Sequence, residues 1–192
     1  MTRVSVEHER VFEDEICAHL AANGWLYSPN GEGYDKTRAL FPTDVIAWLK
    51  ETQPEELAKI VKPSMSPSEQ DRAKEQLLDR LVQALDLPLE SGGGTLAVLR
   101  KGFKKTPARF SMCEFKPATT LNAAAMERYA AVRLRVVRQV YYSGEHKGSI
   151  DLVLFVNGLP VATLELKTDN TQSIEHAKAQ YRTDRDPKGE PL

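Results

Sequence analysis

The stretch SIDLVLFVNGLPVATLELK, residues 149–167, decides the fold. Residues 151–156 and 161–166 are rich in β-branched and other apolar side chains, which favours two neighbouring strands. Asn157-Gly158 between them is a strong signal for a hairpin turn. The first strand is apolar on both faces, which indicates a central position in a sheet. The stretch therefore predicts a hairpin whose first strand is central in a β-sheet.

Three charged residues lie within this otherwise apolar hairpin: Asp151, Glu165 and Lys167. Charged side chains are rarely buried unless something pairs with them, and Glu165 and Lys167 share a face because strand side chains alternate. Two converging carboxylates would suit Mg²⁺, which prefers oxygen ligands, with Lys167 beside an attacking water. That arrangement serves metal-assisted hydrolysis of a phosphodiester. The alternative is a structural ion pair of Glu165 with Lys167 or a nearby arginine, with Asp151 a turn residue.

The length of the hairpin turn decides whether the two carboxylates can meet. A two-residue turn at Asn157-Gly158 would place Ile150 opposite Glu165 and direct Asp151 to the other face. A three-residue turn that includes Leu159 would place Asp151 directly opposite Glu165. A shared metal site therefore predicts a turn of odd length, or an equivalent bulge.

The rest of the chain contains helices and further strands. Helical spacing of apolar residues, with turn and capping signals at the ends, predicts helices over residues 11–21, 42–49, 54–61, 67–85 and 174–182. Strands are expected over residues 95–99, 109–115 and 134–142. Gly92-Gly93-Gly94 predicts an internal linker or a tight loop between subregions. The pattern as a whole predicts an α/β fold with a mixed central sheet flanked by helices, elaborated by the helical region 42–90.

The composition excludes several classes of protein. The chain has 192 residues, of which 41% are hydrophobic and 28% are charged, enough for one sizeable core. It contains no apolar run that could span a membrane and no secretion signal at its start. Its two cysteines, Cys17 and Cys113, are too few for a disulfide scaffold or a zinc site. We therefore expect an intracellular globular protein.

The charge of the chain is unevenly distributed. Residues 1–99 carry ten Lys and Arg against seventeen Asp and Glu, whereas residues 100–192 carry sixteen against ten. A basic half favours contact with a polyanion, although a solvated charged face explains many such counts. The basic loop that follows residue 99 is equally compatible with a solvated turn and with contact to a nucleic-acid backbone. Its candidate contact residues are Arg100, Lys101, Lys104 and Lys105.

The hairpin and its surroundings resemble a known family of nucleases. Ile150-Asp151, followed by Glu165-Leu166-Lys167 at the end of the next strand, resembles the motif of the PD-(D/E)XK superfamily. The wider stretch 149–167 is similar to the N-terminal nuclease domain of the R subunit of type I restriction enzymes. The resemblance implies a restriction-endonuclease-like fold and a single nuclease domain over residues 1–192. Other segments typical of that family are residues 12–16, Gly24-Trp25, 138–142 and 180–187.

The resemblance implies a role for each matching residue. Asp151 and Glu165 would bind Mg²⁺, with the carbonyl of Leu166 as a further ligand, and Lys167 would orient or activate water. Glu13 matches the acidic residue that completes the pocket in related nucleases, and Glu9, one turn earlier, is the weaker candidate. The residues that match contacts on the DNA side are Gln180 and Tyr181.

This sequence departs from the nuclease pattern at two points. Ile150 replaces the proline that names the motif, and the spacing Gln-x-x-x-Tyr is absent because Gln180 is followed directly by Tyr181. The first departure has no consequence if the turn survives without proline. The second weakens the assignment of Gln180 and Tyr181 to the DNA side.

The function implied by the resemblance is Mg²⁺-dependent endonucleolytic cleavage of double-stranded DNA in the cytoplasm of a prokaryote. The partners would be the methyltransferase and specificity subunits of a restriction complex, with no membrane. The sequence contains no Walker A loop, so ATP would be bound only by a motor domain downstream in a longer chain. We therefore expect the 192 residues to be an N-terminal fragment. Two alternatives are a DNA-binding or subunit-docking module whose nuclease site has decayed, and a related DNA-repair nuclease.

Overall fold

The α/β class predicted from the sequence is confirmed. The computed structural model contains, within the residues it describes, six α-helices, a four-stranded sheet and a two-stranded sheet. None of the helices in this part of the chain combines the length and the apolar character needed to cross a membrane. The described residues are 3–29, 31–141, 149–166 and 178–179.

The chain forms two compact units that interleave along the sequence. Unit 1 consists of residues 1–39, 134–155 and 162–192. Unit 2 consists of residues 40–133 and 156–161. The hairpin over residues 149–164 therefore has its two outer ends in unit 1 and its turn in unit 2.

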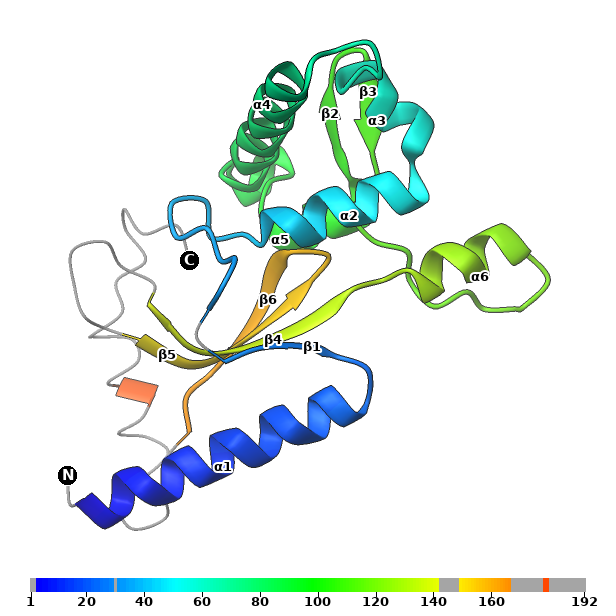
Figure 1. The fold of residues 1–192 in the computed structure, drawn as a ribbon. Helices are drawn as coiled ribbons and strands as arrows, with labels where there is room; N and C mark the ends of the chain where they lie inside the picture. Colours follow the sequence, from blue (N-terminus) through cyan, green and yellow to red (C-terminus); the bar gives the residue numbers. More distant parts are fainter. Residues whose placement is uncertain (1–2, 30, 142–148, 167–177, 180–192) are drawn as a thin grey trace. The chain divides into compact units, whose positions relative to one another are not determined.

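Unit 1 is built on the larger sheet, whose strand order is β1-β4-β5-β6 (Figure 1). Strand β1 pairs in parallel with β4, and the short turn makes β5 and β6 antiparallel, so the sheet is mixed as predicted. The apolar strand β5 lies inside the sheet, which is the position its sequence indicates. The strands are β1 (Leu26–Ser28), β4 (Leu134–Tyr141), β5 (Ser149–Val156) and β6 (Leu159–Leu164).

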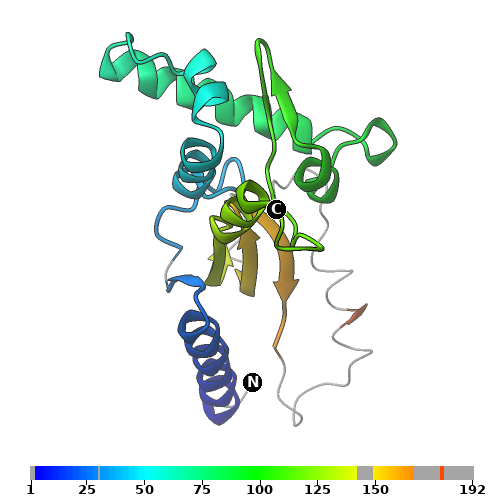
Figure 2. The same cartoon turned by 90° about the vertical axis from the view of Figure 1, so that its right-hand side faces the viewer.

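Helix α1 (Arg3–Ala22) packs on one face of this sheet, as Figures 1 and 2 show. Its apolar stripe contributes Cys17, which is buried with Val136 of β4 and Leu152 of β5. The helix ends at Asn23-Gly24 as predicted, because Gly24 takes a φ of 88°, which favours glycine. This packing fixes which face of α1 is directed at the two central strands.

The hairpin turn has two residues, so the prediction of an odd-length turn is wrong. Asn157 and Gly158 have φ angles of 49° and 85°, the combination that closes a two-residue turn with the twist of the strands. The buried side chain of Asn157 accepts the N–H of Arg133 at 2.7 Å and donates to the carbonyl of Met112 at 2.9 Å. These bonds anchor the turn within unit 2.

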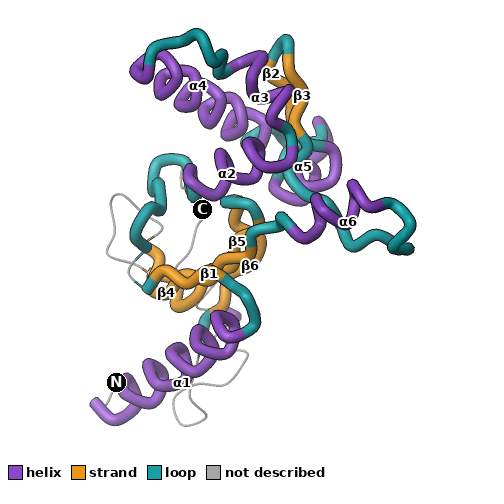
Figure 3. The backbone as a smooth tube through the Cα atoms, turned by 45° about the vertical axis from the view of Figure 1, so that its right-hand side comes forward, coloured by secondary structure: helices purple, strands orange, loops and turns teal. Residues whose placement is uncertain are grey.

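Unit 2 has a second apolar core that includes Trp48, Leu77, Leu81 and Phe110. Figure 3 shows the helices of this unit in purple and its two short strands in orange. The helices predicted from residue 42 to residue 85 are confirmed, including the capping box of Ser66 with Glu69. The elements are α2 (Pro42–Thr52), α3 (Pro54–Ile60), α4 (Pro67–Leu85), a 3₁₀ turn (Leu89–Ser91), α5 (Thr95–Lys101), β2 (Phe103–Lys105), β3 (Ala108–Phe110) and α6 (Ala123–Ala130).

Three predictions for unit 2 need correction. The strand expected over residues 95–99 is the helix α5, because a short apolar run fits either structure and glycines at both of its ends cap a helix. The strand expected from Arg109 to Phe115 ends at Phe110. The three glycines 92–94 form a tight loop within unit 2, not a boundary between the two units. The basic loop expected after residue 99 contains the end of α5 and the strand β2, and no element was predicted at β1 or α6.

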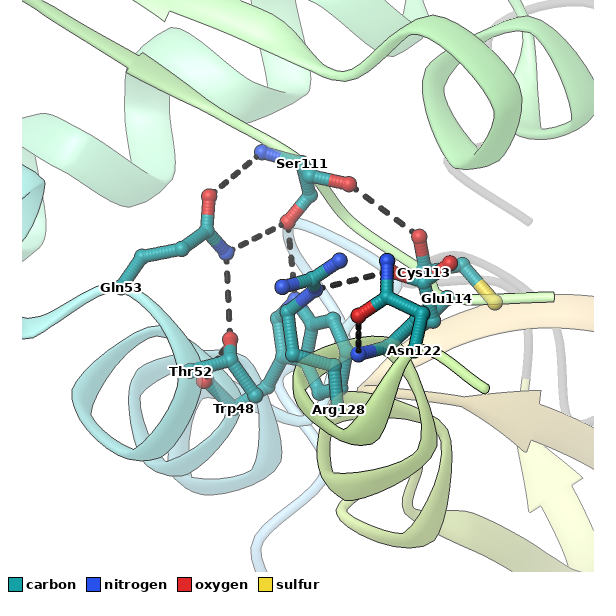
Figure 4. A network of polar contacts seen from close by, with 9 residues as sticks. Trp48, Thr52, Gln53, Ser111, Cys113, Glu114, Asn122 and Arg128 are labelled. Atoms are coloured by element: carbon teal, nitrogen blue, oxygen red, sulfur yellow. Dashed lines mark hydrogen bonds and ion pairs between the residues drawn. The ribbon is translucent and has the colours of Figure 1, made fainter. Parts of the chain in front are cut away.

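A polar network holds the end of β3 in place (Figure 4). The side-chain amide of Gln53 donates to the carbonyl of Ser111 at 2.8 Å and accepts its N–H at 2.7 Å, as a neighbouring strand would. The indole of Trp48 donates to the same carbonyl at 2.8 Å. The end of the smaller sheet is therefore fixed to the end of α2.

Candidate functional site

Two of the predicted metal ligands meet through the side chain of a third residue in unit 1. Glu13 lies on α1 and is only 5% exposed, while Asp151 lies on β5. The amide nitrogen Nε2 of Gln139 donates to Oε1 of Glu13 at 3.0 Å and to Oδ1 of Asp151 at 3.4 Å. The hydroxyl of Ser149 donates to Oε1 of Gln139 at 2.8 Å, which fixes the orientation of the amide. A single N–H₂ group thus lies between two carboxylates.

Gln139 reaches Glu13 because the backbone of β4 is kinked at this residue. Val136 and Arg138 of β4 both contact residues of α1, as alternate positions on one face should. The next residue, Gln139, would face the other way in a regular strand, but its φ of 52° interrupts the alternation. Such kinks, like β-bulges, redirect one side chain and are common beside active sites. Consecutive residues of β4 therefore both reach α1.

The environment of Glu13 favours the neutral form of its buried carboxyl group, as the direction of its pKa shift shows. Burial raises the pKa of Glu13 above its ordinary value, and the nearby Asp151 raises it further. The hydrogen bond from Gln139 and the charge of Arg138 act in the opposite direction. Arg138 Nε lies 3.7 Å from Oε2 of Glu13, and its guanidinium also pairs with Asp14. A cation placed between Glu13 and Asp151 would relieve the repulsion between them.

Asp151 also contacts the segment that carries Glu165. The backbone N–H of Leu166 donates to Oδ2 of Asp151 at 2.7 Å. Strand β6 ends at Leu164, so the alternation that would separate Asp151 from Glu165 across a two-residue turn does not continue to Glu165. Glu165 and Leu166 are both half-buried. Lys167, the third residue of the predicted catalytic set, lies outside the described residues.

The chemistry of these residues fits a hard divalent cation. Glu13, Asp151 and Glu165 supply carboxylate oxygens, which Mg²⁺ prefers, and the Gln139 amide marks a position that favours positive charge. Among the residues that the structure describes, no three acidic, histidine or cysteine side chains are grouped closely enough to hold a metal ion. The described part therefore brings two of the carboxylates together around Gln139.

The residues predicted to contact DNA lie elsewhere in the chain. Gln180 and Tyr181 are outside the described residues, as is the helix expected over 174–182 except for Lys178 and Ala179, which are helical. The basic candidates belong to unit 2, at the end of α5 and on β2. They are Arg100, Lys101, Lys104 and Lys105.

Sequence reasoning missed Gln139 and Ser149. The one signal was that Gln139 is an uncharged polar residue in β4, whose other side chains are apolar, aromatic or those of arginine. In a regular strand, however, alternation with Val136 and Arg138 would direct Gln139 to the opposite face. Only the kink at its own φ angle brings it to the site.

These observations define an α/β protein with a mixed sheet and carboxylates gathered where its first helix meets the central strands. The family model described as type I restriction enzyme R protein N terminus matches residues 7–192. The chain therefore belongs to this family, as its sequence motifs predicted. No curated protein and no solved structure matches the chain.

Proposed function

We propose that this chain is the nuclease domain of a type I restriction enzyme R subunit and cleaves double-stranded DNA with the help of Mg²⁺. The observation that carries the proposal is the Gln139 amide shared between Glu13 and Asp151. A buried carboxylate and a half-buried one that face each other across a single N–H₂ group are costly, and a cation at that place would offset the cost. Membership of a restriction enzyme family makes phosphodiester hydrolysis the reaction that such a cation would serve.

In this proposal each residue has a defined part. Asp151 and Glu165 would hold Mg²⁺, with Glu13 and the carbonyl of Leu166 as further ligands. A divalent cation held by these residues would supply Lewis-acid chemistry to phosphodiester hydrolysis. Lys167 orients the attacking water and offsets negative charge that develops on the phosphate. The N–H of Leu166 holds the Asp151 carboxylate in position for this role.

The wider assembly follows from the same family. The methyltransferase and specificity subunits would supply recognition of the DNA sequence, and an ATP-dependent motor in the same subunit would move the DNA. Gln180 and Tyr181 would contact the DNA beside the cleavage site. The 192-residue chain would then cleave weakly and without sequence preference when it is separated from these parts.

Titration with Mg²⁺ and Mn²⁺ by calorimetry tests the metal site without depending on cleavage. We expect the chain to bind either ion, and Asp151→Ala and Glu165→Ala each to abolish the binding. Glu15→Ala is the matched control, because Glu15 is an exposed carboxylate on the same helix as Glu13. Absence of binding to the unmodified chain would overturn the proposal and favour a module that docks onto other subunits.

A further inference from the structure

The smaller sheet in unit 2 has one apolar face and one cationic face. In the pairing of β2 with β3, Phe103 lies opposite Phe110 and Lys104 lies opposite Arg109. Phe103 and Phe110 are buried in the core of unit 2, where their rings stack with centroids 5.3 Å apart. Lys104 and Arg109 are exposed. The exposed face of this sheet thus holds two cations side by side.

These cations are not neutralised by the part of the chain that the structure describes. Lys104 and Arg109 form no ion pair with any described residue, and neither does the exposed Lys101 at the end of α5. Like charges directly opposite each other across two strands destabilise a sheet. Lys105, in contrast, is engaged within the fold, because its Nζ donates a hydrogen bond to the carbonyl of Gln76 at 3.1 Å. The pair Lys104 and Arg109 therefore carries a cost that the fold does not require.

Lys101 is held beside this pair by a close approach of the backbone. Gly102 has a φ of 70°, and a Cβ atom at this position would lie 1.9 Å from the carbonyl oxygen of Phe110. Only glycine allows α5 to end against β3 in this way. Lys101 and Arg109 line an open pocket of about 360 Å³. The other lining residues are Gln53, Glu56, Phe110 and Ser111.

The single carboxylate in the pocket does not cancel these cations. Glu56 pairs with Lys59 of its own helix and accepts the backbone N–H of Arg109 at 3.0 Å. Both contacts hold the pKa of Glu56 below its ordinary value, so it remains ionised and engaged. The three cations Lys101, Lys104 and Arg109 are therefore available to an external anion. We call them the cationic ribbon.

We propose that the cationic ribbon binds the phosphate backbone of DNA, as a second contact surface in the unit that does not carry Asp151. The ribbon presents flexible cationic side chains from a rigid platform, which suits phosphates and offers no base readout. Its binding is independent of sequence and strongly dependent on salt. The choice of DNA as the polyanion rests on the proposed function, since the family acts on DNA in a restriction complex.

Fluorescence anisotropy with a labelled 20-base-pair duplex of arbitrary sequence, in EDTA, tests the ribbon separately from the metal site. For Lys104→Gln/Arg109→Gln we expect binding at least about ten-fold weaker at low salt than for the unmodified chain. The slope of log K against log salt should become shallower by about 1.8, which corresponds to two lost phosphate contacts. The variant should unfold at the same or a slightly higher temperature, because a like-charge repulsion is removed.

Two controls separate the possible outcomes. Lys62→Gln/Lys116→Gln removes the same charge from exposed positions outside the ribbon and should retain the original affinity and slope. Asp151→Asn should lose metal-dependent cleavage and retain DNA affinity, so failure of the nuclease proposal is distinguishable from failure of the ribbon. An unchanged salt slope in the ribbon variant, or an equal loss in the charge-matched control, would overturn the inference.

Discussion

The backbone N–H of Leu166 donates a hydrogen bond of 2.7 Å to Oδ2 of Asp151. This bond ties the chain after β6 to a carboxylate on β5, beyond the last residue of the strand pairing. The peptide group that donates it is the one that joins Glu165 to Leu166. The segment carrying Glu165 is therefore held beside Asp151 even though the turn of the hairpin has two residues.

Replacing Asp151 should release that segment. In Asp151→Ala the N–H of Leu166 loses its acceptor, so we expect its amide hydrogen to exchange faster by about ten-fold, in line with a lost charged hydrogen bond of roughly 1.5 kcal/mol. Amide exchange measured by NMR checks this. Ser149→Ala, two residues earlier on the same strand, removes a different bond and should leave Leu166 unaffected.

Removal of the Gln139 side chain should lower the free energy of unfolding, and the loss should be larger without Mg²⁺ than with it. Gln139→Ala leaves Glu13 and Asp151 without their shared donor, for which we expect a loss of roughly 2 kcal/mol in the free energy of unfolding. Excess Mg²⁺ should shrink this difference by supplying positive charge at the same place. Urea unfolding with and without Mg²⁺ makes the comparison, and an equal loss under both conditions would contradict the metal site.

The stability of the protein should depend on pH through Glu13. Because burial raises the pKa of Glu13 above 4.5 in the folded state, the folded protein resists ionisation of this group more than the unfolded chain does. The unmodified chain should therefore lose stability relative to Glu13→Gln as the pH rises through that raised pKa. Urea unfolding in EDTA across this range measures the difference. Glu15→Gln, at an exposed position, should instead follow the unmodified chain.

The turn at Asn157 should tolerate neither glycine nor alanine. Asn157→Gly keeps the left-handed backbone but leaves the N–H of Arg133 and the carbonyl of Met112 without partners, at a cost of about 2–4 kcal/mol. Asn157→Ala should lose about 1 kcal/mol more, because alanine also disfavours a positive φ. Urea unfolding ranks the two variants. Equal stability for both would show that the positive φ of this residue does not contribute to the loss.

Replacing Gly102 by alanine should destabilise the protein more than the same replacement of a glycine that has no close neighbours. Gly102→Ala meets the carbonyl of Phe110 and a backbone region reserved for glycine, so we expect a loss of at least about 2 kcal/mol. Gly24→Ala also has a positive φ, but its Cβ would have no neighbour within 4 Å, and a loss near 1 kcal/mol is expected. Thermal unfolding of the two variants tests whether the close approach, rather than φ alone, decides the cost.

Much of the fold follows from local signals in the sequence. The apolar run of β5, the Asn157-Gly158 turn and the capping box at Ser66 each specify their structure within a few residues, and the structure confirms them. The strand β1 has only three residues, and its pairing with β4 joins positions more than 100 residues apart. No local pattern records such a pairing. The helix α5 was mistaken for a strand because its apolar run is short enough to fit both periods.

The candidate site was predictable as a set of residue types but not as an arrangement. Charged residues in an apolar hairpin indicated Asp151 and Glu165, and the family resemblance added Glu13 from the distant first helix. The role of Gln139 in the site depends on its own φ angle, which composition and spacing do not encode. The ribbon depends on cross-strand register in the same way, since Arg109 stands opposite Lys104 only in the folded hairpin.

The kink in β4 makes the length of this strand as important as its composition. The positive φ of Gln139 interrupts the alternation of side chains, so the residues before it and after it do not share one regular pattern of inward and outward positions. Deleting one residue before Gln139 would shift the alternation of side chains by one position, and we expect the residue at this place to be directed away from α1. Within the family, a one-residue gap beside this position would therefore signal a dismantled site, even in a chain that keeps both Glu13 and Asp151.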